Sequence, residues 1–302
     1  MSDSRQFPTV SVIVPAHNEV GYIEACVQSL QAQEYAGDIE ILVVDNASDD
    51  ATAQVVRDLG VRVVTETTRG VCSARQAGSL VARGDLFIST DADTTFDPFW
   101  VQRIVAAFGD DESIVAVSGS FQFEDRPRWG LHYSRLLFRL TQFFYRMFGV
   151  PLYAPASNFA FRRDAFLSLG GYNTTLTQGG DEYDMLRRLR PLGRVVYMPN
   201  NPVYTSSRRL NRGFLYTMFV TFFYYYVGSY VLSVVLKRQV IGSAPIHRET
   251  SISRAHRFLL SVGVLVAIAV AWKCTTLSVG EVVEHRGAVA HAVRVIHHTS
   301  AR

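Results

Sequence analysis

Short apolar runs alternate with longer amphipathic stretches between residues 9 and 118. The runs are rich in β-branched residues and end at proline, glycine or aspartate, a pattern typical of buried strands. The stretches between them repeat apolar residues every three or four positions, as a helix with one buried face does. This alternation predicts an α/β fold built on a doubly wound, mainly parallel sheet. The predicted strands cover residues 10–14, 39–44, 61–64, 86–90 and 114–118, and the predicted helices cover 19–33, 70–82 and 98–108, with another opening at 48–50.

The first predicted helix has both a buried face and a start signal. Val20, Ile23, Val27 and Leu30 recur at helical spacing and would form the buried stripe. Asn18, directly before the helix, is a residue type that caps helix N-termini well.

Beyond residue 118 the alternation weakens, and one long helix is predicted at residues 131–148. Its apolar and aromatic residues are interleaved with Arg135, Arg139 and Arg146. A basic amphipathic helix of this kind lies well at a membrane surface, but the same pattern fits a helix packed on the core. The sequence leaves both alternatives open.

Two hydrophobic segments follow, at residues 213–236 and 258–272. The first has no charged residue and is long enough to cross a bilayer, which takes about 20 apolar residues. If both crossed, the basic linker between them would lie opposite the preceding domain, against the positive-inside tendency. We therefore expect at most one true span, with the tyrosine-rich first segment in or near the interface. A buried helical hairpin in a soluble protein is the alternative.

The chain thus divides into three predicted parts. An α/β domain covers residues 1–210, hydrophobic membrane-associating helices form an appendage at 211–280, and a basic tail covers 281–302. Hydrophobic residues make up 48% and charged residues 19% of the chain, which excludes a disordered protein. The net charge of +3 is too small to indicate a nucleic-acid partner, and we predict none.

The cysteines and the N-terminus indicate the compartment. Cys26, Cys72 and Cys274 are far apart and lack metal-ligand spacing, so we expect free thiols in a reducing environment. Residues 1–8 are polar and show no apolar core of a signal peptide.

Two aspartates follow the predicted strand at 86–90. Asp91 and Asp93 are one residue apart, so in an extended chain they point to the same side. Ligands of open α/β sheets bind at this carboxyl edge. A divalent cation relieves the repulsion between two such carboxylates, and Mg²⁺ commonly takes one or two of them plus phosphate oxygens. The alternative is an Asx turn without a ligand.

Other predicted strands end in polar residues as well. Asn18 and Glu19 follow the first strand and Asp45 follows the second. Polar groups at successive strand ends indicate one site at the sheet edge. No strand is followed by Gly-x-Gly-x-x-Gly, so a dinucleotide-binding domain lacks its fingerprint.

Four motifs in this order resemble family 2 glycosyltransferases, which have the GT-A fold. They are Val-Ile-Val-Pro-Ala-His-Asn-Glu at 12–19, Val-Val-Asp-Asn-Ala-Ser-Asp-Asp at 43–50, Ala-Arg-Gln-Ala-Gly at 74–78 and Asp-Ala-Asp at 91–93. The resemblance covers about residues 9 to 210. It implies a nucleotide-sugar half at 9–118 and an acceptor half at 119–210.

The resemblance also implies roles for single residues. The loop from Pro15 through His17 to Glu19, together with Asp45, would hold the base and ribose of a nucleotide sugar. Arg75 would reach the nucleotide side, although a solvated helix face is the alternative for it, as a helix start is for Glu19. Asp93 would coordinate a divalent metal, Mg²⁺ or Mn²⁺, that bridges the diphosphate, and Asp91 would contact the ribose or the metal.

The predicted catalytic base departs from the family pattern. Relatives usually have Gly-Glu-Asp, with the central Asp as general base, where this chain has Gly180, Asp181 and Glu182. Glu182 therefore stands at the position of the base, and Asp181 precedes it, where it could also cap a helix. The reaction needs one carboxylate that takes the proton of the acceptor hydroxyl.

A second departure lies at residues 205–209. Many relatives have a histidine here as an extra metal ligand, whereas this chain has Thr-Ser-Ser-Arg-Arg. Arginine donates two parallel hydrogen bonds to phosphate. We therefore predict that Arg208 or Arg209 stabilises the leaving diphosphate or binds an anionic acceptor.

Together these features predict an inverting glycosyltransferase at the cell membrane, with its catalytic domain on the cytoplasmic face. The donor would be a nucleoside-diphosphate sugar, with UDP as the first guess, and the acceptor a hydroxyl or a lipid phosphate on a lipid or glycan. One alternative is a catalytically silent, membrane-attached binding protein of the GT-A fold. Another is a sugar nucleotidylyltransferase, although the Gly-rich basic loop expected after its first strand is absent at 15–19.

Overall fold

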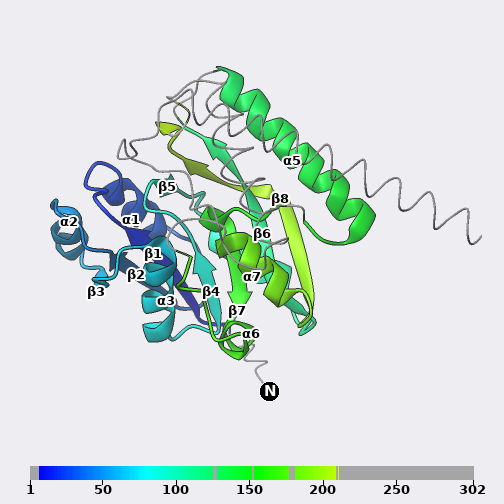
Figure 1. Ribbon diagram of the computed structural model, residues 1–302, viewed down its shortest axis with the longest axis horizontal. Coiled ribbons are helices and arrows are strands. Elements are labelled where there is room, and N and C mark those ends of the chain that lie inside the picture. Colours follow the sequence, from blue (N-terminus) through cyan, green and yellow to red (C-terminus); the bar gives the residue numbers. More distant parts are fainter. Residues whose placement is uncertain (1–6, 125–127, 152, 177–180, 209, 211–302) are drawn as a thin grey trace, which may run out of the picture.

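The computed structural model describes residues 7–124, 128–151, 153–176, 181–208 and 210 (Figure 1). The predicted hydrophobic helices at 211–280 and the basic tail at 281–302 lie outside the described residues, as do Arg209 and Cys274. Among the described residues, no helix is long and apolar enough to span a membrane.

Helices and strands alternate through the first half of the chain, as the sequence predicts. The strands are β1 (Val10–Ala16), β2 (Ile39–Asp45), β3 (Arg62–Thr65), β4 (Leu86–Ser89), β5 (Thr94–Thr95), β6 (Ile114–Phe123), β7 (Phe159–Arg162) and β8 (Arg194–Thr205). The helices are α1 (Ile23–Gln31), α2 (Thr52–Asp58), α3 (Val71–Val81), α4 (Trp100–Phe108), α5 (Arg128–Phe148), α6 (Arg163–Ser168) and α7 (Asp181–Leu189), with a 3₁₀ turn at Ala156–Asn158.

The strands form one mixed sheet in the order β3-β2-β1-β4-β7-β6-β8-β5. Strands β3, β2, β1 and β4 are parallel, as predicted. Strand β7 is antiparallel to both of its neighbours, β4 and β6, and β5 is antiparallel to β8. The prediction of a mainly parallel sheet therefore holds for the half before β5, while the second half is mixed because β7 enters between β4 and β6.

Both faces of the parallel half are covered, which explains why its strands are almost continuously apolar. Val12 and Val14 of β1 point into the core beneath α1 and α4, while Ile13 points into the core beneath α3. Gly78 lets α3 approach the sheet closely, because a Cβ atom there would lie 2.7 Å from Ile13 Cγ2 and 2.8 Å from Val44 Cγ2.

Helices α1 and α2 begin later than the sequence predicts. Helix α1 begins at Ile23, and Val20, expected in its buried stripe, is 45% exposed in the preceding turn. Asn18 does not cap α1: it has a positive φ of 56°, and Tyr22 stands at the cap position without a side-chain hydrogen bond. Helix α2 begins at Thr52 rather than at 48–50. In both places the predicted first turn is loop, because the two loops bind each other.

Helix α5 has one face packed on the core and a second face that is exposed and apolar. The helix lies alongside β6 and β8 (Figure 1). On its inner face Phe138 packs against Phe121 of β6 at 4.9 Å and Tyr145 against Tyr197 of β8 at 5.9 Å between ring centroids. Its opposite face is exposed and apolar. The exposed apolar residues of α5 are Leu136, Leu140, Phe143, Met147 and Phe148.

The two described cysteines agree with the prediction of free thiols. Cys26 and Cys72 are both free and buried. Burial raises the pKa of each thiol, so neither has the thiolate character of a reactive cysteine.

Candidate active site at the carboxyl edge of the sheet

The loops that follow β1 and β2 are joined by hydrogen bonds. The Asn18 amide donates to Ser48 Oγ at 3.1 Å, and the Asp49 amide donates to Asn18 Oδ1 at 2.8 Å. Asn18 and Ala47, one in each loop, are the non-glycine residues with positive φ in the described chain. Such strained positions persist where the surroundings hold them and cluster at functional sites.

The predicted base and ribose ligands line these loops. Pro15 lies in β1 and is half-buried, as are His17 and Asp45. His17 Nδ1 is 2.9 Å from the carbonyl oxygen of Asn46, and the Asp45 carboxylate accepts from the Ser48 amide at 3.3 Å. The structure thus brings these residues to one edge, and their contact with a nucleotide remains a prediction.

Asn46 is a positioning residue that the sequence reasoning missed. Its buried amide donates to the carbonyls of Glu66 and Thr68 at 3.1 and 2.8 Å, and its Oδ1 accepts from the Gly70 amide at 2.8 Å. It therefore fixes the loop that leads from β3 into α3. Its position could have been noticed from the sequence, because Asn46 directly follows the second strand within the motif at 43–50.

Arg75 of α3 joins two segments of the site. It is 2% exposed, so the alternative of a solvated helix face is wrong. Its guanidinium lies 2.6 Å from Asp91 and also pairs with Asp181 at the start of α7. Burial opposes the charge of Arg75, but Asp181 and Asp91 outweigh it and raise the pKa of the guanidinium. In this structure Arg75 thus holds the loop after β4 against α7.

The pKa values of the two adjacent acids at 181 and 182 shift in opposite directions. Burial opposes ionisation of Asp181, but Arg75 outweighs it and lowers the pKa of that carboxyl. Burial and the neighbouring charge of Asp181 raise the pKa of Glu182 well above its usual value. Glu182 Oε2 is buried and has no hydrogen-bond partner among the described residues. Asp181 is therefore the ionised partner of Arg75, and Glu182 is the acid of the pair that holds its proton more strongly.

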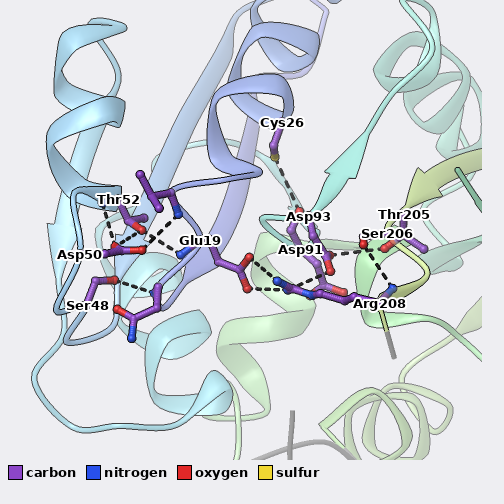
Figure 2. A network of polar contacts seen from close by, with 12 residues as sticks. Glu19, Cys26, Ser48, Asp50, Thr52, Asp91, Asp93, Thr205, Ser206 and Arg208 are labelled. Carbon is purple, nitrogen blue, oxygen red and sulfur yellow. Dashed lines mark hydrogen bonds and ion pairs between the residues drawn. The ribbon is translucent and has the colours of Figure 1, made fainter. Parts of the chain in front are cut away.

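The second aspartate of the Asp-Ala-Asp motif faces a different arginine, as Figure 2 shows. Arg208, just after β8, donates to both carboxylate oxygens of Glu19 at 2.5 and 2.8 Å, and its Nη2 lies 2.9 Å from Asp93 Oδ2. The guanidinium lies 4.8 Å from the ring centre of Tyr22. Thr205 Oγ1 is 3.4 Å from Asp93 Oδ1. Sequence reasoning brought Arg208 to the site but missed Tyr22 as its aromatic neighbour.

One detail of the motif prediction is wrong. The extended-strand alternation assumed for Asp91 and Asp93 does not apply, because β4 ends at Ser89 and the chain turns at Ala92 and Asp93. Each carboxylate consequently contacts its own arginine.

The paired charges leave an excess of negative charge at this edge. Four carboxylates paired with two guanidinium groups give a formal charge of minus two. Hard oxygen donors in a negative site fit Mg²⁺ or Mn²⁺. No group of three or more His, Cys, Asp or Glu side chains in the described part of the chain could hold an ion alone, so phosphate or water oxygens would complete the shell. The groups counted are Glu19, Asp91, Asp93 and Asp181 against Arg75 and Arg208.

Comparison with known families and structures agrees with this geometry. The model described as Glycosyl transferase family 2 matches residues 11–170, more than half of the 302 residues. This span includes the β1 and β2 loops and the Asp91–Asp93 turn.

The relatives by sequence are glycosyltransferases. The glucosyl-dolichyl phosphate glucuronosyltransferase of Haloferax volcanii is 27% identical over 185 residues, which cover 58% of this chain and 59% of that protein. The PGL/p-HBAD biosynthesis glycosyltransferase of Mycobacterium bovis is 29% identical over 177 residues, which cover 55% of this chain and 64% of that protein. The chain therefore spans less than two thirds of the length of either relative.

Solved structures share the fold. The mannosyltransferase PcManGT of Pyrobaculum calidifontis, solved with GDP-Man and Mn²⁺, matches with a TM-score of 0.57 at 22% identity over 92% of this chain and 81% of its own. Glucosyl-3-phosphoglycerate synthase of Mycobacterium tuberculosis, solved with Mn²⁺, UDP-Glc and phosphoglyceric acid, matches with a TM-score of 0.53 at 22% identity over 68% and 74%. At this identity the likeness shows the GT-A fold. Because the family match covers more than half of the chain, the protein belongs to glycosyl transferase family 2.

Proposed function

We propose that the protein transfers a sugar from a nucleoside-diphosphate sugar to an acceptor hydroxyl or lipid phosphate, with inversion at the anomeric carbon. The observation that carries the proposal is that Arg75 pairs with both Asp91 and Asp181. It thereby brings the carboxylates predicted to bind the nucleotide sugar next to the predicted base, Glu182. The nucleotides in the two solved neighbours are GDP-Man and UDP-Glc. UDP is our first choice, since Asp45 could accept from the uracil N–H.

The donor set fits a divalent cation, and Asp93 and Asp91 would hold it. When bound, a cation of this kind neutralises the charge that builds up on the departing diphosphate. Both neighbours named above were solved with Mn²⁺, which supports Mn²⁺ or Mg²⁺ as the cation.

Glu182 is our candidate for the general base. Its carboxylate would take the proton of the acceptor hydroxyl while the acceptor oxygen forms a bond to the anomeric carbon and the bond to the diphosphate breaks. A single displacement of this kind inverts the anomeric centre. Arg208, and Arg209 beside it, would bind the diphosphate oxygens as they become negative.

A lipid-linked acceptor is the class we favour. One relative is a glucosyl-dolichyl phosphate glucuronosyltransferase, and its name places a lipid phosphate in its reaction. The exposed face of α5 supports the same view, because it joins an apolar stripe to a row of exposed arginines and α5 contains no acidic residue. The arginines in this row are Arg135, Arg139 and Arg146.

We therefore propose that this face of α5 lies on the cytoplasmic surface of the cell membrane, against anionic lipids. The guanidinium groups would contact the anionic lipid headgroups while the apolar stripe beside them contacts the acyl chains. In a Cys274→Ser background, a fluorophore on Met147→Cys should be quenched by brominated lipid in phosphatidylserine vesicles. The same label on Leu80→Cys, an equally exposed site on α3, should not be quenched. Equal quenching at the two sites, or none at Met147→Cys, would contradict the placement of α5.

Turnover of a panel of UDP- and GDP-sugars, with and without Mn²⁺, tests the transferase proposal. Glu182→Gln should keep nucleotide binding and lose about 10²-fold or more of the transfer rate, which is typical of a lost general base. Asp58→Ala, on the exposed surface of α2, is the control and should match the wild type. Nucleotide binding by the wild type without turnover of any donor would instead favour the silent binding protein. Family membership argues against the nucleotidylyltransferase alternative.

A further inference from the structure

Arg208 occupies a place where a cation is expected. Its Nη2 lies 2.9 Å from Asp93 Oδ2, and Asp93 is the aspartate predicted to bind the metal. The side chain of Asp93 is only 9% exposed, and its Oδ2 is already in contact with the guanidinium. The other carboxylate oxygen of Asp93 faces the Thr205 hydroxyl (Figure 2).

Arg208 does not depend on Asp93 for its position. Its forked hydrogen bonds to Glu19 use both Nη atoms at 2.8 and 2.5 Å, and the Tyr22 ring lies under the guanidinium at 4.8 Å. If the contact with Asp93 is lost, the guanidinium keeps its two hydrogen bonds to Glu19 and its cation–π contact with Tyr22, and these hold it in place. Asp93 can therefore exchange Arg208 for another cation without release of the arginine from the site.

We infer that Arg208 is a built-in cation that competes with the divalent metal for Asp93 and couples metal binding to nucleotide binding. Without nucleotide, Arg208 neutralises Asp93 and keeps metal affinity low. When the metal takes Asp93, the freed side of the guanidinium is available for the donor diphosphate. This inference rests on the proposed function. It assigns two opposite effects to Arg208, which weakens Mn²⁺ binding and strengthens nucleotide binding.

The first test measures Mn²⁺ alone by electron paramagnetic resonance, with the full-length chain and no nucleotide. Arg208→Gln should bind Mn²⁺ about tenfold tighter than the wild type, within the range of coupled sites, because Asp93 loses its competitor. Arg194→Gln, which removes an exposed arginine paired with Asp111, is the matched control and should leave Mn²⁺ affinity unchanged.

The second test titrates UDP and GDP at saturating Mn²⁺. Arg208→Gln should bind the preferred nucleotide about tenfold more weakly, because the diphosphate loses a guanidinium partner. Arg208→Lys keeps the positive charge but cannot donate two parallel hydrogen bonds. It should therefore shift the affinities for Mn²⁺ and for the nucleotide in the same directions as Arg208→Gln, but by less. It also carries the test if Arg208→Gln does not fold.

Unchanged or weaker Mn²⁺ binding in Arg208→Gln, or in Arg208→Lys as its substitute, would overturn the inference. So would tighter Mn²⁺ binding that leaves nucleotide affinity unchanged, since the coupling would then be absent. If the wild type binds Mn²⁺ but neither nucleotide, the proposed function fails, and the first titration still decides whether Arg208 competes for Asp93.

Discussion

At the scale of single residues, Arg75 explains why the loop after β4 and the start of α7 stay together. It is buried in α3 and pairs with Asp91 after β4 and with Asp181 at the start of α7. A buried guanidinium with two carboxylates is expensive to desolvate, and removal of one partner leaves uncompensated charge. Arg75, Asp91 and Asp181 therefore serve to position the loop after β4 against α7, and they contribute little to the net stability of the fold.

Arg75→Met tests this role through stability. The buried Asp181 and the half-buried Asp91 would both lose their cation, so the free energy of unfolding should fall by about 3–5 kcal/mol. Arg62→Met, which breaks an exposed pair with Glu40, should cost less than about 1 kcal/mol. Denaturant melts of the two variants give the comparison, and equal losses would count against a special role for Arg75.

The state of Glu182 predicts the pH profile. Burial and the charge of Asp181 raise the pKa of Glu182, and a general base acts only when ionised. The kcat/KM value should therefore rise with pH through a limb well above the usual glutamate pKa of about 4.3. A limb at that usual value would show that Glu182 is not the group that titrates.

At the scale of elements, the parallel strands β1 to β4 could be predicted, and the loops that follow them could not. The apolar runs at β1, β2 and β4 were predictable because burial on both faces of the sheet demands them. The starts of α1 and α2 were not, since Asn18 binds the β2 loop and does not cap a helix. Local propensity does not reveal a partner that lies about 30 residues away in the chain.

Close packing of α3 on the sheet gives an element-scale prediction. Gly78→Ala would gain helix propensity, but its Cβ would collide with Ile13 and Val44. We expect a net loss of about 1–3 kcal/mol in the free energy of unfolding. Gly21→Ala, which meets nothing within 4 Å, is the control. A Gly78→Ala variant as stable as that control would mean that α3 can move away from the sheet at little cost.

At the scale of the whole molecule, residues distant in sequence complete the site. Glu19 and Arg208 are 189 positions apart, and Arg75 and Asp181 are 106 apart. The family resemblance predicted that these residues share one site, but only the fold shows that two arginines bind the carboxylates in pairs. The mixed half of the sheet makes this possible, because β8 ends beside β5 and the Asp93 turn.

The most direct measurement is calorimetric titration of UDP and GDP into the full-length protein, with and without Mn²⁺, for the wild type and Asp93→Ala. We expect base-selective binding that requires Mn²⁺ and is lost in Asp93→Ala, while Asp58→Ala binds like the wild type. Absence of binding by the wild type, or binding that Asp93→Ala leaves intact, would contradict a metal-dependent donor site at this edge of the sheet.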